Sequence, residues 1–275
     1  METDYDRLRF FALLPIAKAC QQKGRAMSDL NAHRATAALT THRNSVEDEL
    51  ARFLGALSQP TEIASAAYNL VLPVDRKFPV ALLKQFLDVH HEQQDAELLL
   101  RHIQPGSRVL QLGGGSGITG VLLSRITGNP VTILEPDPRM AMAISKTFAA
   151  NSGAMALQRA IAVPGNQPRS TCSVQAYNLD WPACTQRNFV TVTCSAVSLA
   201  EITRATSYTV LAINLVEPDF DVIADPHLDT INMLIIDTPH TAFSASRQNA
   251  MCQSLANIGF ALVDHSQRRY IFERG

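Results

Sequence analysis

Near the middle of the chain the sequence reads Val109-Leu-Gln-Leu-Gly113-Gly-Gly115-Ser-Gly117-Ile-Thr-Gly120. An aliphatic run typical of a strand leads into a cluster of glycines, and an amphipathic stretch typical of a helix follows at once. Glycine lets the backbone turn tightly and approach a ligand without a Cβ clash. The first N–H groups of the following helix have no partner inside that helix. This order of elements predicts a loop that holds a nucleoside cofactor.

A second aliphatic run, Pro130–Leu134, ends in Glu135, about 20 residues after the glycines, where an acid hydrogen-bonds ribose hydroxyls. The glycines fit two fingerprints. The GxGxxG form, from Gly115 to Gly120, is the dinucleotide pattern, but that pattern starts at the end of the strand, and this one does not. The GxGxG form, from Gly113 through Gly115 to Gly117, does start there, and it suits a site without a pyrophosphate. We favour the second form.

The rest of this half alternates aliphatic runs with helical patterns, which predicts a Rossmann-like, doubly wound α/β fold with a mostly parallel sheet. Phe260–Ser266 and Arg268–Glu273 predict a C-terminal antiparallel hairpin. Residues 154–200 predict short strands and loops in place of a flexible linker, and they form either an ordinary insertion or a wall that faces the substrate. The expected strands are Arg108–Leu112, Pro130–Leu134, Ala156–Val163, Thr209–Leu215 and Ile231–Asp237, and the expected helices are 117–127, 138–151, 220–228 and 244–258.

The chain before residue 104 repeats apolar residues at helical spacing, as in Ser45–Leu57 and Pro79–His102. We therefore expect two parts. Residues 1–85 form an N-terminal helical region that serves as a lid or as the interface of a homodimer, and residues 86–275 form the nucleoside-binding domain.

The composition narrows the choice of partner and compartment. The 275 residues carry 24 Lys and Arg against 25 Asp and Glu, and 46% of them are hydrophobic, which excludes a disordered chain. The net charge of −1 gives no footprint for nucleic acid or for an anionic membrane, so we expect neither partner. The cysteines are odd in number and form no CxxC pair, and the acidic start does not suit a signal peptide, which together predict a cytoplasmic protein.

Several motifs resemble the FkbM-type family of class I S-adenosylmethionine-dependent methyltransferases. They are the lead-in Gln104–Gly113, the pair Ala160-Ile161, the fourth-strand segment Leu211–Asp219, the acid-ended fifth strand at Asp237, and Leu255–Phe260 before the hairpin. The resemblance implies S-adenosylmethionine as the cofactor. The residues expected to bind it are Glu92, Gln111, Gly113, Gly115, Gly117, Glu135, Ala160 and Ile161.

The sequence departs from the family in its fourth-strand motif. The family's Lys, Asp, Glu and Gly correspond to Ala212, Asn214, Val216 and Glu217, and its first-motif acid corresponds to Gln111. Asn214 forms hydrogen bonds but cannot act as a carboxylate base. Ligands of such sheets bind beyond the carboxyl ends of the strands. The catalytic candidates there are Asn214, Glu217, Asp237 and His240.

The resemblance implies O-methylation of a hydroxyl on a small molecule, such as a sugar or a natural-product intermediate. The altered motif leaves open a catalytically inactive cofactor-binding protein, and the glycines leave open an NAD(P)-dependent oxidoreductase. We expect no metal site, because the adjacent His90 and His91 would point about 100° apart on a helix.

Overall fold

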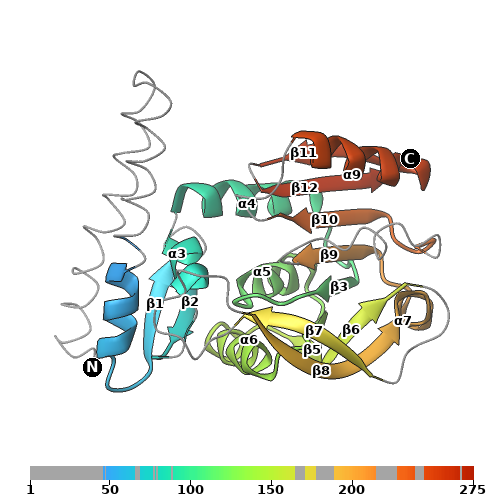
Figure 1. Cartoon of the computed structure of the whole chain (residues 1–275). Coiled ribbons are helices and arrows are strands. Elements are labelled where there is room, and N and C mark those ends of the chain that lie inside the picture. Colours follow the sequence, from blue (N-terminus) through green and yellow to red (C-terminus); the bar gives the residue numbers. More distant parts are fainter. Residues whose placement is uncertain are drawn as a thin grey trace. The chain divides into compact units, whose positions relative to one another are not determined.

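The computed structural model describes residues 46, 48–65, 69–76, 78, 80–87, 89–164, 171–177, 189–214, 228–238, 245–266 and 268–275. The chain divides into two compact units. The first comprises Met1–Gln93 with Tyr177–Phe189, and the second comprises Gln94–Ala176 with Val190–Gly275. Figure 1 labels the elements of both.

The second unit is built on a seven-stranded sheet with the order β11-β12-β10-β9-β3-β4-β5. The strands β5, β4, β3, β9 and β10 are parallel to one another, while β12 runs antiparallel to both β10 and β11. The predicted α/β fold and the predicted C-terminal hairpin are therefore confirmed. The strands are β3 (Val109–Leu112), β4 (Val131–Leu134), β5 (Met155–Gln158), β9 (Val210–Asn214), β10 (Met233–Asp237), β11 (Phe260–His265) and β12 (Arg269–Arg274).

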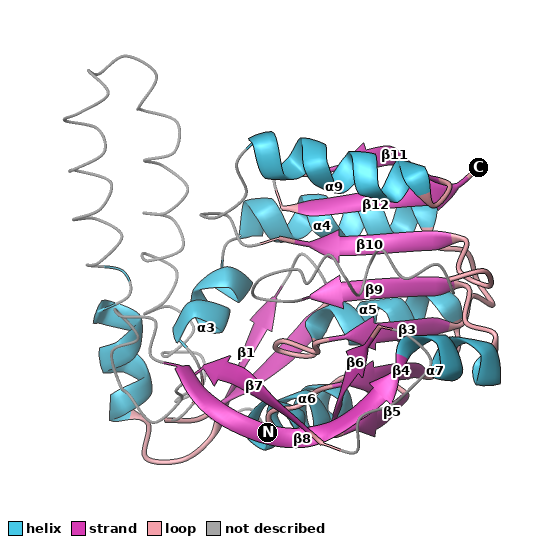
Figure 2. Cartoon of the chain, turned by 45° about the vertical axis from the view of Figure 1, so that its right-hand side comes forward, coloured by secondary structure: helices cyan, strands magenta, loops and turns pink. Residues whose placement is uncertain are grey.

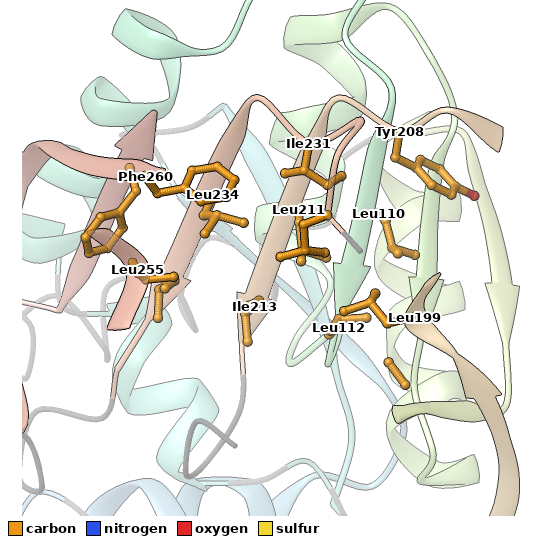
Figure 3. Packing of buried hydrophobic residues seen from close by; sticks show 14 of the residues in the cluster. Leu110, Leu112, Leu199, Tyr208, Leu211, Ile213, Ile231, Leu234, Leu255 and Phe260 are labelled. Carbon is orange, nitrogen blue, oxygen red and sulfur yellow. The ribbon is translucent and has the colours of Figure 1, made fainter. Parts of the chain in front are cut away.

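Helices cover both faces of this sheet, as Figure 2 shows. Strands covered on both faces have near-continuous apolar sequences, and this accounts for the aliphatic composition. Successive residues of β3 point to opposite faces. Leu110 and Leu112 pack into a core with residues of α7 and α9 (Figure 3), and Gln111 points toward α5. The helices are α4 (Val89–His102), α5 (Ile118–Thr127), α6 (Pro138–Ala150), α7 (Leu199–Thr206) and α9 (Ala245–Asn257).

A separate three-stranded sheet has the order β6-β8-β7, formed by β6 (Ala160–Val163), β7 (Cys172–Tyr177) and β8 (Phe189–Ser198). The predicted single strand Ala156–Val163 is in fact two. It divides at the exposed Arg159. Before this residue β5 pairs with β4 in the main sheet, and after it β6 pairs with β8 in the separate sheet. The predicted pattern of short strands in residues 154–200 is found in the part of that segment that the structure describes.

The first unit was predicted to be a helical region, but the structure shows strands in it as well. Residues 48–56 and α3 (Val80–Leu87) are helical, but β1 (Thr61–Ser65) and β2 (Leu70–Val74) pair as an antiparallel sheet. The buried residues of β2 are Leu70, Leu72 and Val74, so its pattern has the two-residue period of a strand. None of the described helices in the protein is both long enough and apolar enough to span a membrane.

Candidate functional site

The glycine loop lies at the carboxyl ends of the parallel strands. Gly113, Gly115 and Gly117 have φ values of 75°, 53° and 89°, in the region that favours glycine. These are the three glycines of the GxGxG form. The loop is tied down at both ends, because the Gly113 N–H donates to the Leu134 carbonyl (2.9 Å) and the Thr147 hydroxyl of α6 donates to the Ser116 carbonyl (2.7 Å).

Asn214, the last residue of β9, lies against this loop. A Cβ placed on Gly115 would lie 2.7 Å from Asn214 Nδ2, closer than real Cβ atoms approach other atoms. Only glycine therefore fits beside this carboxamide without a shift. The geometry brings together two predicted site residues: Gly115, expected to bind the cofactor, from the loop after β3, and Asn214, expected to be catalytic, from the end of β9.

Glu135 follows β4, and its side chain is buried under the loop. Its two carboxylate oxygens accept hydrogen bonds from the N–H groups of Gly114 and Asp137, each at 3.0 Å. Burial raises the pKa of Glu135, although these two hydrogen bonds act in the opposite direction. Each oxygen of a carboxylate accepts more than one hydrogen bond. Glu135 thus fixes the loop and retains acceptor capacity for a ligand.

Gln111 stands where the resemblance places an acid, and its side chain is fully buried. Its Nε2 donates to the carbonyl of Gly113 at 3.0 Å, a bond that an ionised carboxylate could not make. Its Oε1 has no partner. A Cβ on Gly120 would lie 3.0 Å from that oxygen, which places it between β3 and α5. Gln111 therefore holds the start of the glycine loop through the Gly113 carbonyl.

Asp237 ends β10 and pairs in register with Asn214 on one side and with Arg269 on the other. The Arg269 guanidinium donates to both carboxylate oxygens of Asp237, at 2.6 and 2.7 Å. Such a bidentate pair is strong and stabilises the charged carboxylate. Asp237, one of the predicted catalytic residues, therefore forms an ion pair with Arg269.

Sequence reasoning missed the arginine pair at the start of β12, the second strand of the terminal hairpin. Arg268 Nε donates to Asp95 Oδ2 of α4 at 2.6 Å, and both side chains are buried. The only sequence signal was two adjacent arginines at the start of the second strand of the predicted hairpin, and that signal did not identify Asp95 as their partner.

The remaining predicted residues lie in several places. Ala160 and Ile161 are on β6, and Ala160 is buried. Glu92 is in α4, but its side chain lies outside the described residues, as do Glu217 and His240 entirely. Within the described ranges, no three His, Cys, Asp or Glu side chains are grouped as a metal site would require.

The described site fits an adenosine-containing cofactor. The glycine loop has no side chain where a Cβ would collide with Asn214, and Glu135 accepts a hydrogen bond from the Gly114 N–H of the same loop. The strand order, with antiparallel β12 between β10 and β11, is that of a Rossmann-like, mostly parallel sheet that ends in an antiparallel hairpin.

Comparison with known proteins gave one relevant curated relative. The ribosomal RNA small subunit methyltransferase G of Gluconobacter oxydans (strain 621H) is 35% identical over 101 residues, which are 37% of this chain and 46% of that protein. The chain thus matches less than half of its relative's length. No protein-family model matches the chain, so the narrower FkbM assignment stays a prediction.

Solved structures give more distant matches. The ribosomal protein L11 methylase of Lactobacillus delbrueckii subsp. bulgaricus is 16% identical, with 68% of this chain and 79% of that chain covered and a TM-score of 0.40. The Methanococcus jannaschii fibrillarin pre-rRNA processing protein is 12% identical, with coverage of 62% and 67% and a TM-score of 0.39. Likeness at this level carries no information about substrate.

The prediction of a small-molecule substrate without a nucleic-acid partner is wrong, because the curated relative is a ribosomal RNA methyltransferase. The error has a physical reason. A net charge of −1 is a sum over 275 residues, and it does not show where 24 basic side chains lie. An enzyme contacts a folded RNA through a local patch, and such a patch is compatible with a neutral whole.

Proposed function

We propose that the protein is an S-adenosylmethionine-dependent methyltransferase that acts on RNA. The observation that carries the proposal is the glycine loop with its three left-handed glycines, in which the Gly114 N–H donates to the Glu135 carboxylate and Gly115 lies beside the Asn214 carboxamide. The similarity to a ribosomal RNA methyltransferase supports RNA as the class of substrate.

The residues of the glycine loop and those around it have distinct roles in this proposal. Glu135 accepts the ribose hydroxyls, and its buried position keeps water from competing for them. The loop backbone packs against the nucleoside, and Gln111 holds the Gly113 carbonyl in place. The bound cofactor would supply a methyl group on a sulfonium, which is already a good leaving group. The protein therefore has mainly to align the nucleophile with it.

Asn214 and Asp237 are suited to orienting a substrate. A carboxamide does not take up a proton near neutral pH, and Asp237 is occupied by two short bonds from Arg269. In the described part of the site, these two groups therefore favour a nucleophile that arrives with a free lone pair. A ring nitrogen of a nucleic-acid base is such a nucleophile, whereas a hydroxyl gains from a base.

Calorimetry with S-adenosylmethionine tests the cofactor, on wild type, Gly115→Ala and the control Gly128→Ala. Both glycines have positive φ, at 53° and 71°, so both substitutions cost similar backbone strain. A Cβ on Gly115 meets Asn214, whereas a Cβ on Gly128 meets open space. We expect Gly115→Ala alone to weaken binding, by about tenfold or more. Wild-type protein that binds NAD(H) and not S-adenosylmethionine would overturn the proposal in favour of an oxidoreductase.

Radiolabelled methyl transfer tests the substrate. Ribosomal RNA is isolated from cells in which the gene is deleted, and transfer RNA and a panel of hydroxylated small molecules are supplied in parallel. We expect label in the RNA fraction and none in the panel. Cofactor binding without transfer to any RNA would instead support an inactive cofactor-binding protein.

A further inference from the structure

Arg269 is the most extensively bonded buried cation among the described residues of the second unit, with only 3% of its surface exposed. A guanidinium is costly to bury unless its donors find acceptors. Besides the two bonds to Asp237, its Nη2 donates to the Thr119 hydroxyl at 3.0 Å and its Nη1 to the Asp95 carbonyl at 3.2 Å. One side chain thus joins the strand β10 to the helices α4 and α5.

The bond to Thr119 connects this side chain to the cofactor loop. Thr119 is in the first turn of α5, two residues after Gly117. Asp237, the other main partner, lies in register with Asn214, whose amide lies beside Gly115. The loop is therefore constrained from two sides, through Thr119 directly and through Asp237 and Asn214 across the sheet.

The charges around Arg269 form a balanced set. Arg268 and Arg269 face Asp95 and Asp237, and the Ser266 hydroxyl completes the coordination of Asp95 with a bond of 2.6 Å to its Oδ1. Lysine would keep the charge at this position, but an ammonium lacks the planar fork needed to bind one carboxylate bidentately and reach Thr119 as well.

We infer that Arg269 is a positioning residue, which sets the first turn of α5 and with it the glycine loop for S-adenosylmethionine. The inference rests on the proposed function for its ligand. Arg269 acts through Thr119 and Asp237, and it does not itself touch the reacting atoms.

The binding test compares Arg269→Lys and Thr119→Val with Arg274→Lys. Arg274 is on the same strand, and its guanidinium donates to the main-chain carbonyls of Leu228, Ile231 and Ile258, none of which belongs to the site. Thr119→Val removes one hydroxyl at nearly constant volume. We expect it to raise the dissociation constant for S-adenosylmethionine about three- to tenfold, the value of one hydrogen bond, at nearly unchanged melting temperature.

Arg269→Lys is expected to raise the same constant further, whereas Arg274→Lys lowers the melting temperature and leaves the constant within twofold of wild type. In the double variant, Thr119→Val adds little to Arg269→Lys, because both remove the same bond. Equal effects of the two Lys substitutions on affinity, or full additivity in the double variant, would overturn the inference.

Amide hydrogen exchange of the cofactor-free protein gives a readout that does not depend on the proposed function. Faster exchange of the peptide that covers residues 113–121 is expected in Arg269→Lys and Thr119→Val, and not in Arg274→Lys. If wild type binds no S-adenosylmethionine, the proposed function fails while this exchange still decides the role of Arg269. Unchanged exchange in both variants would show that Arg269 does not position the loop.

Discussion

Gln111 presents an amide at a fully buried position, and the amide is needed there. Its Nε2 donates to the Gly113 carbonyl at 3.0 Å. With Gln111→Glu, an ionised carboxylate would face that carbonyl without a donor. We expect the free energy of unfolding near pH 7.5 to fall by about 3 kcal/mol, the cost of a buried group left unpaired.

The free energy of unfolding of Gln111→Glu should also depend on pH. Burial raises the pKa of the introduced carboxyl in the folded state, so that state takes up a proton first as the pH falls, and the protonated acid again donates to Gly113. Urea unfolding at pH 5 and pH 7.5 should therefore show partial recovery of stability at the lower pH. Gln111→Met is the control, because it loses the same donor but cannot titrate. Equal pH dependence in both variants would contradict this account.

Glu135 is a native residue of the site whose pKa is shifted, and this shift makes the stability of the protein depend on pH. Its folded pKa is raised from 4.5, so its ionisation costs stability, and that cost grows as the pH rises from 4.5 through the folded pKa. We expect Glu135→Gln to abolish this part of the pH dependence. The amide also turns an N–H₂ group toward one of the two backbone N–H donors, so affinity for S-adenosylmethionine should fall about tenfold or more.

Calorimetry at pH 5 and pH 7.5 measures both effects for Glu135→Gln, and Glu201→Gln serves as control. Glu201 is exposed in the first turn of α7, outside the cofactor loop. A variant Glu135→Gln that binds S-adenosylmethionine as tightly as wild type would show that the ribose does not depend on this carboxylate.

At the scale of elements, α4 is fastened to the C-terminal hairpin through Asp95. Burial alone would raise the pKa of Asp95, but Arg269, Arg268 and the hydrogen bonds from Ser266 and Arg268 outweigh burial and lower it from 3.8. A carboxyl with a lowered folded pKa stabilises the fold above its unfolded pKa, and this contribution is lost as the pH falls below 3.8.

Asp95→Asn should therefore remove a contribution that is present at neutral pH. Because the variant leaves Arg268 buried beside a neutral amide, we expect a loss of about 3–5 kcal/mol at pH 7. The difference from wild type should shrink as the pH is lowered from 4 to 2.5. Urea unfolding across this range measures it, with Asp229→Asn, at an exposed turn position, as the control. A pH-independent difference would mean that Asp95 acts through packing alone.

The helices and strands that could be predicted are those whose sequence pattern lies within a short window of the chain. The strands β3, β4, β9 and β10 and the helices α5, α6 and α9 follow from aliphatic runs and helical spacing, which are properties of short windows. The strands β1 and β2 were hidden between helical patterns. The split at Arg159 reflects pairing between β6 and β8, which lie far apart in the sequence.

The candidate site shows the same limit. The glycines and Glu135 have a fixed order and spacing along the chain, and the sequence alone brought them together. The ion pairs of Asp95 with Arg268 and of Asp237 with Arg269 join residues 173 and 32 positions apart. No spacing rule predicts such a pair. Asp237 was therefore predicted only as a catalytic candidate, and the structure shows it bound to Arg269.

At the scale of the whole molecule, the cofactor loop and the described residues around it belong to the second compact unit. A ligand that binds only the folded state stabilises it by about 2.7 kcal/mol at one hundred times its dissociation constant. For a unit of this size we expect S-adenosylmethionine to raise the melting temperature by about 5–10 °C.

Scanning calorimetry combined with hydrogen exchange would measure this stabilisation and locate it. Slower exchange is expected in peptides from 109–151, which contain the loop, Glu135 and α6. At the same ligand concentration, a tenfold weaker affinity in Gly115→Ala, whose Cβ meets Asn214, should reduce both changes to about half, whereas Gly128→Ala should preserve them. A rise in melting temperature that is as large in Gly115→Ala as in wild type would mean that S-adenosylmethionine binds away from the glycine loop, because the substitution would then leave unchanged the differential affinity from which the stabilisation arises.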